Sequence, residues 1–219
     1  MDWTKHGELV RKGLTPAQAQ LVLLREAELR VAEALSLMSI HGVKELAAQG
    51  GNRSMSAGLF AQLADTNNGN RPVLSYNANG ALTEEKMKAA LREVFKTGNP
   101  NTIWCSYANK DVINTFNIAN PNLSVGASVN DHTAGTYIDK INFEGRILAV
   151  RIDIDMPDDK IAIVNQGKCK KGWLQSDGLT LKDEPAASSR EFRKSIQGSV
   201  GFIVEDVGYE HTFIEGITH

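Results

Sequence analysis

Apolar residues recur at three- and four-residue steps in the first part of the chain, which is the spacing of one face of a helix. They are Leu21, Leu24, Val31, Leu35 and Met38. Thr15 fits the N-cap of this helix, Pro16 its first position, and Gln18 completes a capping box. Gly42 offers a left-handed stop. The pattern predicts a helix from Thr15 to about Ile40, roughly 37 Å long, which crosses most of a molecule of this size.

The middle of the chain predicts a helix, a strand and a helix. Residues 50–80 are rich in Gly, Asn and Ser, which indicates a loop, with one apolar patch at 58–63 that predicts a short helical turn. Residues 83–98 carry the pattern of an amphipathic helix, and residues 103–107 that of a buried strand. Asn109 is a candidate cap for a third helix. This order gives the middle of the chain an α/β character.

The last third of the chain changes to an alternating pattern. Apolar residues alternate from Ile147 to Met156, which predicts a long strand that ends at Pro157, and residues 161–164 predict another. Alternation over residues 195–217 suggests a terminal pair of strands. The predicted fold class is therefore α+β, with a helix-rich middle and β-rich flanking parts.

Charge and cysteine content narrow the functional classes. The chain has 219 residues, with 24 Lys and Arg against 26 Asp and Glu. The net charge of −2 argues against a protein whose main task is to wrap nucleic acid. Cys105 and Cys169 are far apart and fit neither a disulfide framework nor a C-x-x-C motif, which favours folding in a reducing cytoplasm. No signal peptide or membrane-length apolar run is present, so we expect no membrane association.

Four carboxylates gather near the end of the predicted long strand, at Asp153, Asp155, Asp158 and Asp159. Alternation along a strand would place the first two on one face, close enough for a hard cation such as calcium. The segment lacks the glycine turn and the terminal glutamate of an EF-hand loop, which favours a solvated strand edge over a metal site. The five histidines are scattered without zinc-ligand spacing. We therefore predict no metal and no cofactor.

Other motifs are weak as catalytic signals. Ser199 lacks the G-x-S-x-G spacing of a nucleophile elbow, and the glycine-rich segment around Arg53 lacks the Gly-Lys-Ser/Thr ending of a phosphate-binding loop. Lys168, Lys170 and Lys171 beside Trp173 form a compact basic patch with an aromatic residue. Such a patch fits either a solvated loop or contact with a nucleic-acid backbone. We predict no catalytic residue.

Taken in order, several segments resemble the major head proteins of tailed bacteriophages with the HK97-like fold, particularly a prophage capsid subgroup. The resemblance extends from about residue 52 to 218. Its segments are NRSMSAGLF (52–60), LTEE (82–85), GNP (98–100), IWC (103–105), NK (109–110), INTF (113–116), RIDIDMPDD (151–159), WL (173–174), RKSIQG (193–198) and FIEGI (213–217). Each segment alone is weakly specific, whereas the ordered set covers most of the chain.

The resemblance implies a peripheral domain that carries the long spine helix (1–50), an axial domain of helices and strands (51–145), and long strands that return to the peripheral domain (146–219). It implies copies that tile into hexamers and pentamers of a shell around double-stranded DNA, with portal and scaffolding proteins as further partners. It places the protein in the virion capsid after synthesis in the host cytoplasm. Only about fourteen residues precede Thr15, so the N-terminal arm and extended loop of the family are expected to be lacking.

The candidate functional residues are therefore residues of subunit edges, where opposite charges give register more than affinity. They are Arg53, Asp153, Asp155, Asp158, Asp159, Lys168, Lys170, Lys171 and Trp173. Two alternatives stay open at this point. One is a head decoration protein or a non-assembling capsid fragment, and the other is a small metal-dependent enzyme built on the carboxylate cluster.

Overall fold

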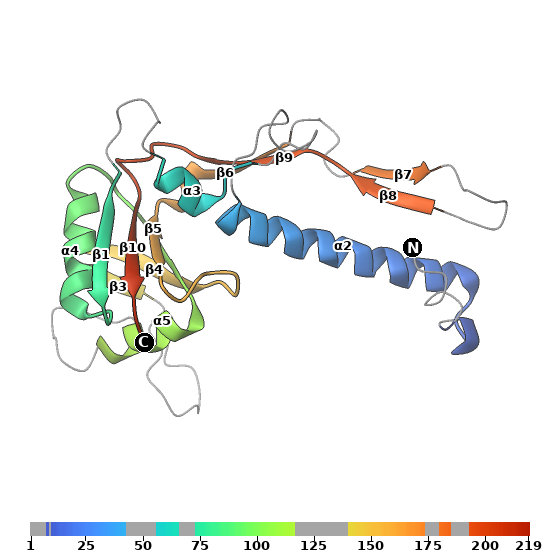
Figure 1. Cartoon of the computed structure of the whole chain (residues 1–219), viewed down its shortest axis with the longest axis horizontal. Helices are drawn as coiled ribbons and strands as arrows, with labels where there is room; N and C mark the ends of the chain where they lie inside the picture. The colour runs from blue at the N-terminus through green and yellow to red at the C-terminus, as the bar shows by residue number, and fades with distance from the viewer. Residues whose placement is uncertain are drawn as a thin grey trace.

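The chain folds into a body built on one mixed sheet, from which a long helix and a narrow strand arm extend to one side (Figure 1). The computed structural model describes residues 8, 10–42, 56–65, 73–116, 140–173, 180–184 and 193–219. The strands of the body come from the middle and the end of the chain. The long helix comes before them and the strands of the arm lie between β5 and β10, so both can extend outside the body.

The central sheet has the strand order β1-β10-β5-β2-β4-β3. Its strands are β1 (Ser75–Gly80), β2 (Thr102–Cys105), β3 (Lys140–Phe143), β4 (Arg146–Ile152), β5 (Ile161–Val164) and β10 (Thr212–Ile217). β1 runs parallel to β10 and β2 parallel to β4, whereas the other neighbours are antiparallel. β1 was not predicted, because its polar sequence SYNANG lacks the apolar alternation of a half-buried strand.

One face of the sheet is covered by α4 (Glu84–Phe95) and α5 (Tyr107–Thr115). Thr83 caps α4 by accepting a hydrogen bond from the Lys86 amide, and Ser106, not the predicted Asn109, caps α5. Both helices send apolar side chains into a core that includes Leu91, Val94 and Ile113. The predicted helix-strand-helix order is therefore confirmed, and it forms this side of the body.

The opposite face of the sheet has a second core, formed with α3 (Leu59–Leu63) and the last turn of α2 (Pro16–His41). Ile40, Leu59 and Leu63 pack there against Phe213 of β10. All four residues of β5 are buried, because Ile161 and Ile163 face the first core while Ala162 and Val164 face the second. A continuous apolar run is what a strand covered on both faces requires.

α2 begins as predicted, with Thr15 as N-cap, Pro16 in the first turn and a capping box to Gln18. Its end differs from the prediction, because Gly42 has φ −53° and is not left-handed. The predicted buried face is also partly wrong. Leu21 is 65% exposed, whereas Leu23, which was not placed on that face, is buried. The helix is apolar on several sides, so periodicity alone was a poor guide to the side that packs.

The arm consists of two short antiparallel ribbons. β6 (Cys169–Trp173) pairs with β9 (Val200–Val204), and β7 (Thr180–Glu184) pairs with β8 (Arg193–Gln197). The arm runs along α2 in Figure 1. The strands predicted over 195–217 therefore exist but do not pair with one another, since β10 lies between β1 and β5 in the central sheet.

The sheet takes strands from both sides of the predicted domain boundary at residue 145. β4, β5 and β10 come from the segment 146–219, yet they pair with strands of the segment 51–145. The division into axial and peripheral domains itself stays a prediction. Within the described residues, no helix is apolar and long enough to cross a membrane.

Candidate subunit-interface residues

The four predicted carboxylates lie in the turn between β4 and β5, not on a strand. β4 ends at Ile152, so the prediction that the strand continues to Met156 is wrong. The Asp155 amide donates a hydrogen bond to Asp153 Oδ1 at 3.0 Å, and the Met156 amide donates to the Asp153 carbonyl at 3.2 Å. An aspartate that bonds its own backbone two residues on favours a turn over a continuing strand.

This acidic turn is held against the end of α2. The Ser36 hydroxyl donates to Asp155 Oδ2 at 2.5 Å, and His41 Nε2 lies 2.5 Å from the Asp155 carbonyl oxygen. Met156 is buried in the second core beside the last turn of α2. Asp155 therefore acts inside the subunit, where it joins the long helix to the body.

In the other half of the turn, the backbone carbonyls of Asp158 and Asp159 accept hydrogen bonds from the body, and their carboxylates point to solvent. The Asp158 carbonyl accepts a hydrogen bond from Asn109 Nδ2 at 2.8 Å, and the Asp159 carbonyl accepts one from the Ile217 amide at 3.2 Å. The side chains of Asp158 and Asp159 are exposed, and Ile154 at the tip of the turn is 85% exposed. The turn thus presents two carboxylates and one apolar residue to solvent on a well-anchored backbone.

Among the described residues, no three or more His, Cys, Asp or Glu side chains are grouped so as to hold a metal ion. The placement of Asp153 and Asp155 on one strand face, which suggested calcium, does not occur, because both lie in the turn. Asp153 Oδ1 accepts a backbone hydrogen bond and Asp155 Oδ2 one from Ser36. The geometry of this turn gives no support to the metal-dependent alternative.

The predicted basic patch lies at the start of the arm, and two of its lysines are paired within the chain. Lys168 Nζ lies 2.8 Å from Asp206 Oδ2, and Lys170 Nζ lies 2.7 Å from Glu205 Oε1. The hydrogen bond and the negative charge of Asp206 raise the pKa of Lys168. Because these acids follow β9, the paired charges fasten the β6–β9 ribbon across its end.

The rest of the patch, Lys171 and Trp173, lies one strand position apart on the same face of β6. The Lys171 ammonium stands over the indole ring of Trp173, 4.4 Å from its centroid. Trp173 is 38% exposed. Because no described ion pair involves Lys171, this cation and its aromatic partner are the part of the patch available to another surface.

A buried histidine, which the sequence had placed only in an alternating strand, joins the arm to the body. His211 is 1% exposed. Its Nδ1 accepts a hydrogen bond from the Asn165 amide at 3.3 Å, so Nε2 carries the proton and donates to the Glu205 carbonyl at 2.7 Å. Burial lowers the pKa of His211, so the ring is held neutral.

Glu210 supports the same junction. Its carboxylate accepts hydrogen bonds from the Asn99 amide at 3.0 Å and from Asn165 Nδ2 at 3.1 Å. The hydrogen bond from Asn99 is the main cause that lowers the pKa of Glu210. His211 and Glu210 thus tie the segment that leaves β9 to the turns after α4 and β5. No spacing signal in the sequence marks such a junction, because its partners are far apart along the chain.

Most of the chain matches a known protein family. The model of a family described as SU10 major capsid protein matches residues 28–218. The chain belongs to this major capsid protein family. No match was found among curated proteins.

The fold of the chain is similar to that of chains in two solved capsid structures. A chain of the capsid of an empty GTA particle matches with a TM-score of 0.59 and 15% identity, over 91% of this chain and 66% of that chain. A chain of the satellite phage P4 procapsid, whose structure includes the size determination (Sid) protein, matches with a TM-score of 0.51 and 10% identity, over 91% and 68%. The chain thus spans about two thirds of either neighbour. These matches confirm the predicted HK97-like α+β fold.

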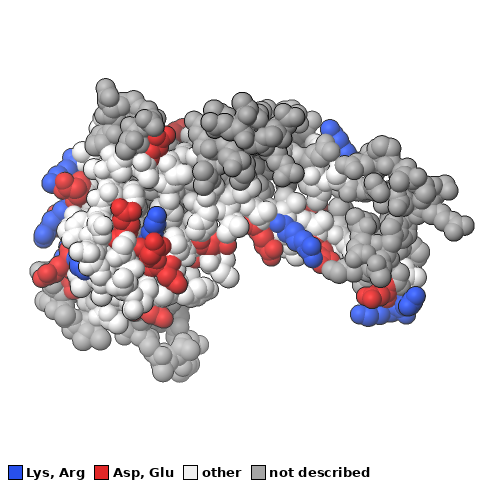
Figure 2. All heavy atoms as spheres, viewed as in Figure 1, with Lys and Arg blue, Asp and Glu red and all other residues white. Residues whose placement is uncertain are grey.

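In this major capsid protein the predicted interface residues fall into separate sets. The acidic turn lies between β4 and β5, and the lysines lie at the root of the arm; among the described residues no ion pair joins the two. Arg53 lies outside the described residues. On the face seen in Figure 2, acidic and basic side chains are interspersed over the body and along α2. Whether any of these residues meets a neighbouring subunit stays a prediction.

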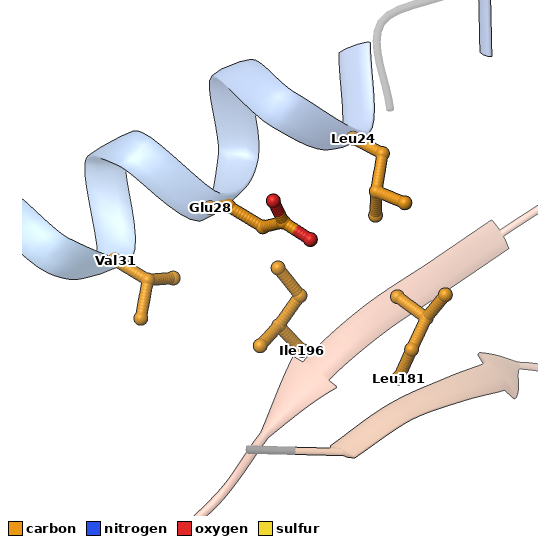
Figure 3. A pocket seen from close by; sticks show the side chains of 5 residues that line it. All are labelled: Leu24, Glu28, Val31, Leu181 and Ile196. Carbon is orange, nitrogen blue, oxygen red and sulfur yellow. The ribbon is translucent and has the colours of Figure 1, made fainter. Parts of the chain in front are cut away.

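A groove that sequence reasoning missed lies between α2 and the β7–β8 ribbon (Figure 3). Its volume is about 250 Å³, and it is lined by Leu24, Glu28, Val31, Leu181 and Ile196. Leu24 and Val31 were correctly predicted on the packing face of the helix, whereas their partners on the ribbon lie at least 150 residues away in the sequence. The groove shows which side of α2 the arm covers.

Proposed function

We propose that this chain is the shell-forming subunit of a tailed-phage head, which assembles with copies of itself into hexamers and pentamers around double-stranded DNA. The observation that carries the proposal is the match of a major capsid protein family over residues 28–218, together with a body-and-arm fold that matches capsid chains. Elongated tiles of this kind cover a surface by many modest contacts between identical copies.

The shape of the subunit supports the proposal physically. α2 and the two ribbons extend well beyond the sheet body (Figure 1), so they expose edges that a compact monomer would bury. α2 alone leaves Leu21, Leu29 and Leu37 between 51% and 65% exposed. These leucines give an extended element apolar side chains that a neighbouring subunit could cover.

The proposal assigns no catalytic reaction to the chain. Synthesis in the cytoplasm of a bacterial host, contact of the inner surface with packaged DNA, and docking to portal and scaffolding proteins are parts of it. With a net charge of −2, the contact with DNA would be weak and independent of its sequence. This suits a shell that encloses DNA without wrapping it.

Among the predicted edge residues, the proposal favours those that the subunit does not use internally. Asp158 and Asp159 are exposed on an anchored turn, and Lys171 stands over the half-exposed Trp173. Lys168 and Lys170 are already paired with acids of their own chain. We therefore assign contacts between subunits to the former group and internal fastening to the latter.

The test is the size of the full-length protein at high concentration. Size-exclusion chromatography with light scattering, followed by negative-stain microscopy of the large fraction, should show capsomers, sheets, tubes or shells. A protein that stays strictly monomeric over a hundredfold range of concentration, with a cooperative thermal transition, would contradict the proposal and favour a non-assembling head component.

A further inference from the structure

The exposed side of α2 carries a ridge with a two-fold pattern. Leu21, Arg25, Leu29, Glu33 and Leu37 follow one another at four-residue steps, and all five are exposed. Residues at this spacing form a continuous ridge on a helix surface, the kind that interdigitates when two helices pack. From here on these five residues are called the α2 ridge.

The centre of the α2 ridge and its part toward Leu37 lie away from the side of the helix that the arm covers. Leu29 and Val31 are about 200° apart around the helix axis, and Val31 lines the groove under the β7–β8 ribbon (Figure 3). The three leucines of the ridge are 65%, 62% and 51% exposed. They form an apolar stripe that the described fold leaves uncovered, although the other side of the same helix is packed.

The order of residues along the ridge is symmetric about Leu29, except that the two charges on either side of it have opposite sign. Read forward it is Leu, Arg, Leu, Glu, Leu; an antiparallel copy presents Leu, Glu, Leu, Arg, Leu. With Leu29 at the centre, Arg25 of one copy meets Glu33 of the other, whereas Leu21 and Leu37 lie about 80° round the helix from Leu29, at the margins of the contact. Both charge pairs form at once, because a two-fold contact is made of the same surface twice.

Arg25 and Glu33 have no ion-pair partner among the residues that the structure describes. Arg25 and Glu33 are about 12 Å apart along the helix axis, too far to pair with each other. Among the described residues neither forms an ion pair, in contrast to the neighbouring Arg30, whose guanidinium lies 3.2 Å from Glu26. Within the part of the chain that the structure describes, the ridge therefore holds a cation and an anion without ion-pair partners, at equal distances on either side of a leucine.

We propose that the α2 ridge is a two-fold contact between two copies of this chain, in which the helices pack antiparallel with Leu29 at the centre. The charge pattern favours a second copy over an unrelated partner, because an antiparallel copy supplies the inverted charges at the matching spacing. The proposal rests on the shell function and specifies one of its contacts. The contact is small, so it acts as one of many in an assembly.

A cysteine at the centre tests the geometry. In the full-length Leu29→Cys variant, two thiols at the axis would lie within disulfide range. Mild oxidation of the assembled fraction should therefore convert most of the chain into a disulfide-linked dimer on a non-reducing gel. The control is Ala34→Cys, an exposed position about 140° round the same helix, which should stay monomeric on the gel.

Charge exchange tests the direction of the pairing. Glu33→Arg places four arginines around the axis and should raise the concentration needed for assembly on the order of tenfold. Arg25→Glu should have a similar effect. The double variant Arg25→Glu/Glu33→Arg restores both pairs with the charges exchanged and should assemble as the wild type does. Far-ultraviolet circular dichroism and thermal melting verify that each variant is folded.

The outcomes separate this contact from the shell function. Assembly of wild type and of Glu33→Arg at the same concentration, with no dimer from Leu29→Cys, would overturn the α2 contact and leave the shell function standing. Two further results together would also overturn it. They are loss of assembly in a single charge variant that the double variant does not restore, and as much disulfide-linked dimer from Ala34→Cys as from Leu29→Cys. They would indicate a different partner for the helix. Failure of the wild type to assemble would count against the shell function instead.

Discussion

The Ser36 hydroxyl donates a 2.5 Å hydrogen bond to the Asp155 carboxylate, across 119 positions of sequence. The bond joins the last turns of the long helix to the turn between β4 and β5. Because both groups are partly buried, loss of the hydroxyl leaves a carboxylate oxygen short of a donor. This contact helps to set the direction in which α2 leaves the body.

Ser36→Ala should therefore lower the free energy of unfolding by about 1–2 kcal/mol. Chemical denaturation followed by circular dichroism measures the change. The matched control is Ser39→Ala on the same helix, whose hydroxyl bonds only the Ser36 carbonyl at 2.7 Å. We expect less than about 0.5 kcal/mol there. Equal effects of the two substitutions would show that the contact with Asp155 adds nothing beyond the helix itself.

The neutral state of His211 predicts a dependence of stability on pH. Its pKa is lowered in the folded protein, so between that pKa and 6.5 the unfolded chain binds a proton that the folded chain does not. Stability should be complete above about pH 6.5 and fall as the pH drops below it. Urea unfolding at several pH values between 5 and 8 measures the slope.

His211→Gln should flatten this slope, because the titrating group is gone. His219→Gln, which removes an exposed ring, is the comparison, and the slope should flatten more in His211→Gln than in His219→Gln. Glu210 does not confuse the result: its pKa is also lowered, and its contribution is lost only below about pH 4.5. A slope that survives in His211→Gln would assign the pH dependence to other groups.

Both cysteines should react slowly in the native protein. Burial raises the pKa of Cys105 and of Cys169 to about 11, so both thiols are protonated at pH 8. A maleimide should label neither within the time that labels both in denaturant, as intact mass shows. In the unassembled fraction, Leu29→Cys should gain one fast site under native conditions, because position 29 is exposed in the single subunit. Fast labelling of the wild type would mean that one of these sites opens readily.

Gly98 should not tolerate even a methyl group. A Cβ at this position would lie 2.2 Å from the Tyr209 carbonyl oxygen and 2.6 Å from the Glu210 Cα, both of them backbone atoms. We expect Gly98→Ala to destabilise the fold by about 1–3 kcal/mol, because the turn after α4 must move away from the segment before β10. Gly167→Ala is the control, since its Cβ would come no nearer than 3.4 Å to a side-chain oxygen. Similar melting temperatures of the two variants would contradict the close approach.

Reversal of the exposed acids should weaken assembly without unfolding the subunit. Asp158→Lys/Asp159→Lys changes two outward side chains whose backbone contacts remain, so the melting temperature should shift by no more than a few degrees. The concentration needed for assembly should rise severalfold. Lys182→Glu, an exposed charge on the arm, serves as a reversal outside the proposed edge set. Equal assembly of all three proteins would remove these acids from the interface.

Local signals were enough to predict much of the fold. The Thr15 and Gln18 side chains accept hydrogen bonds from amides at the start of α2, and Pro16 has no amide hydrogen to satisfy. The spacing of Met87, Ala90, Leu91 and Val94 suffices to predict α4. Such signals depend on neighbours within a few residues, so they can be read in order along the chain. The ordered segments carried the capsid resemblance for the same reason, and the family match bears it out.

Tertiary structure decided how these elements combine. No local pattern indicates that β10 enters the sheet between β1 and β5, that Asp206 takes Lys168 as its partner, or that His211 is buried at the root of the arm. α2 carries leucines on several sides, and only the position of the β7–β8 ribbon settles which side is covered and which is the α2 ridge. The physical reason is that burial and charge pairing depend on residues far apart in sequence, which meet only when the sheet has formed.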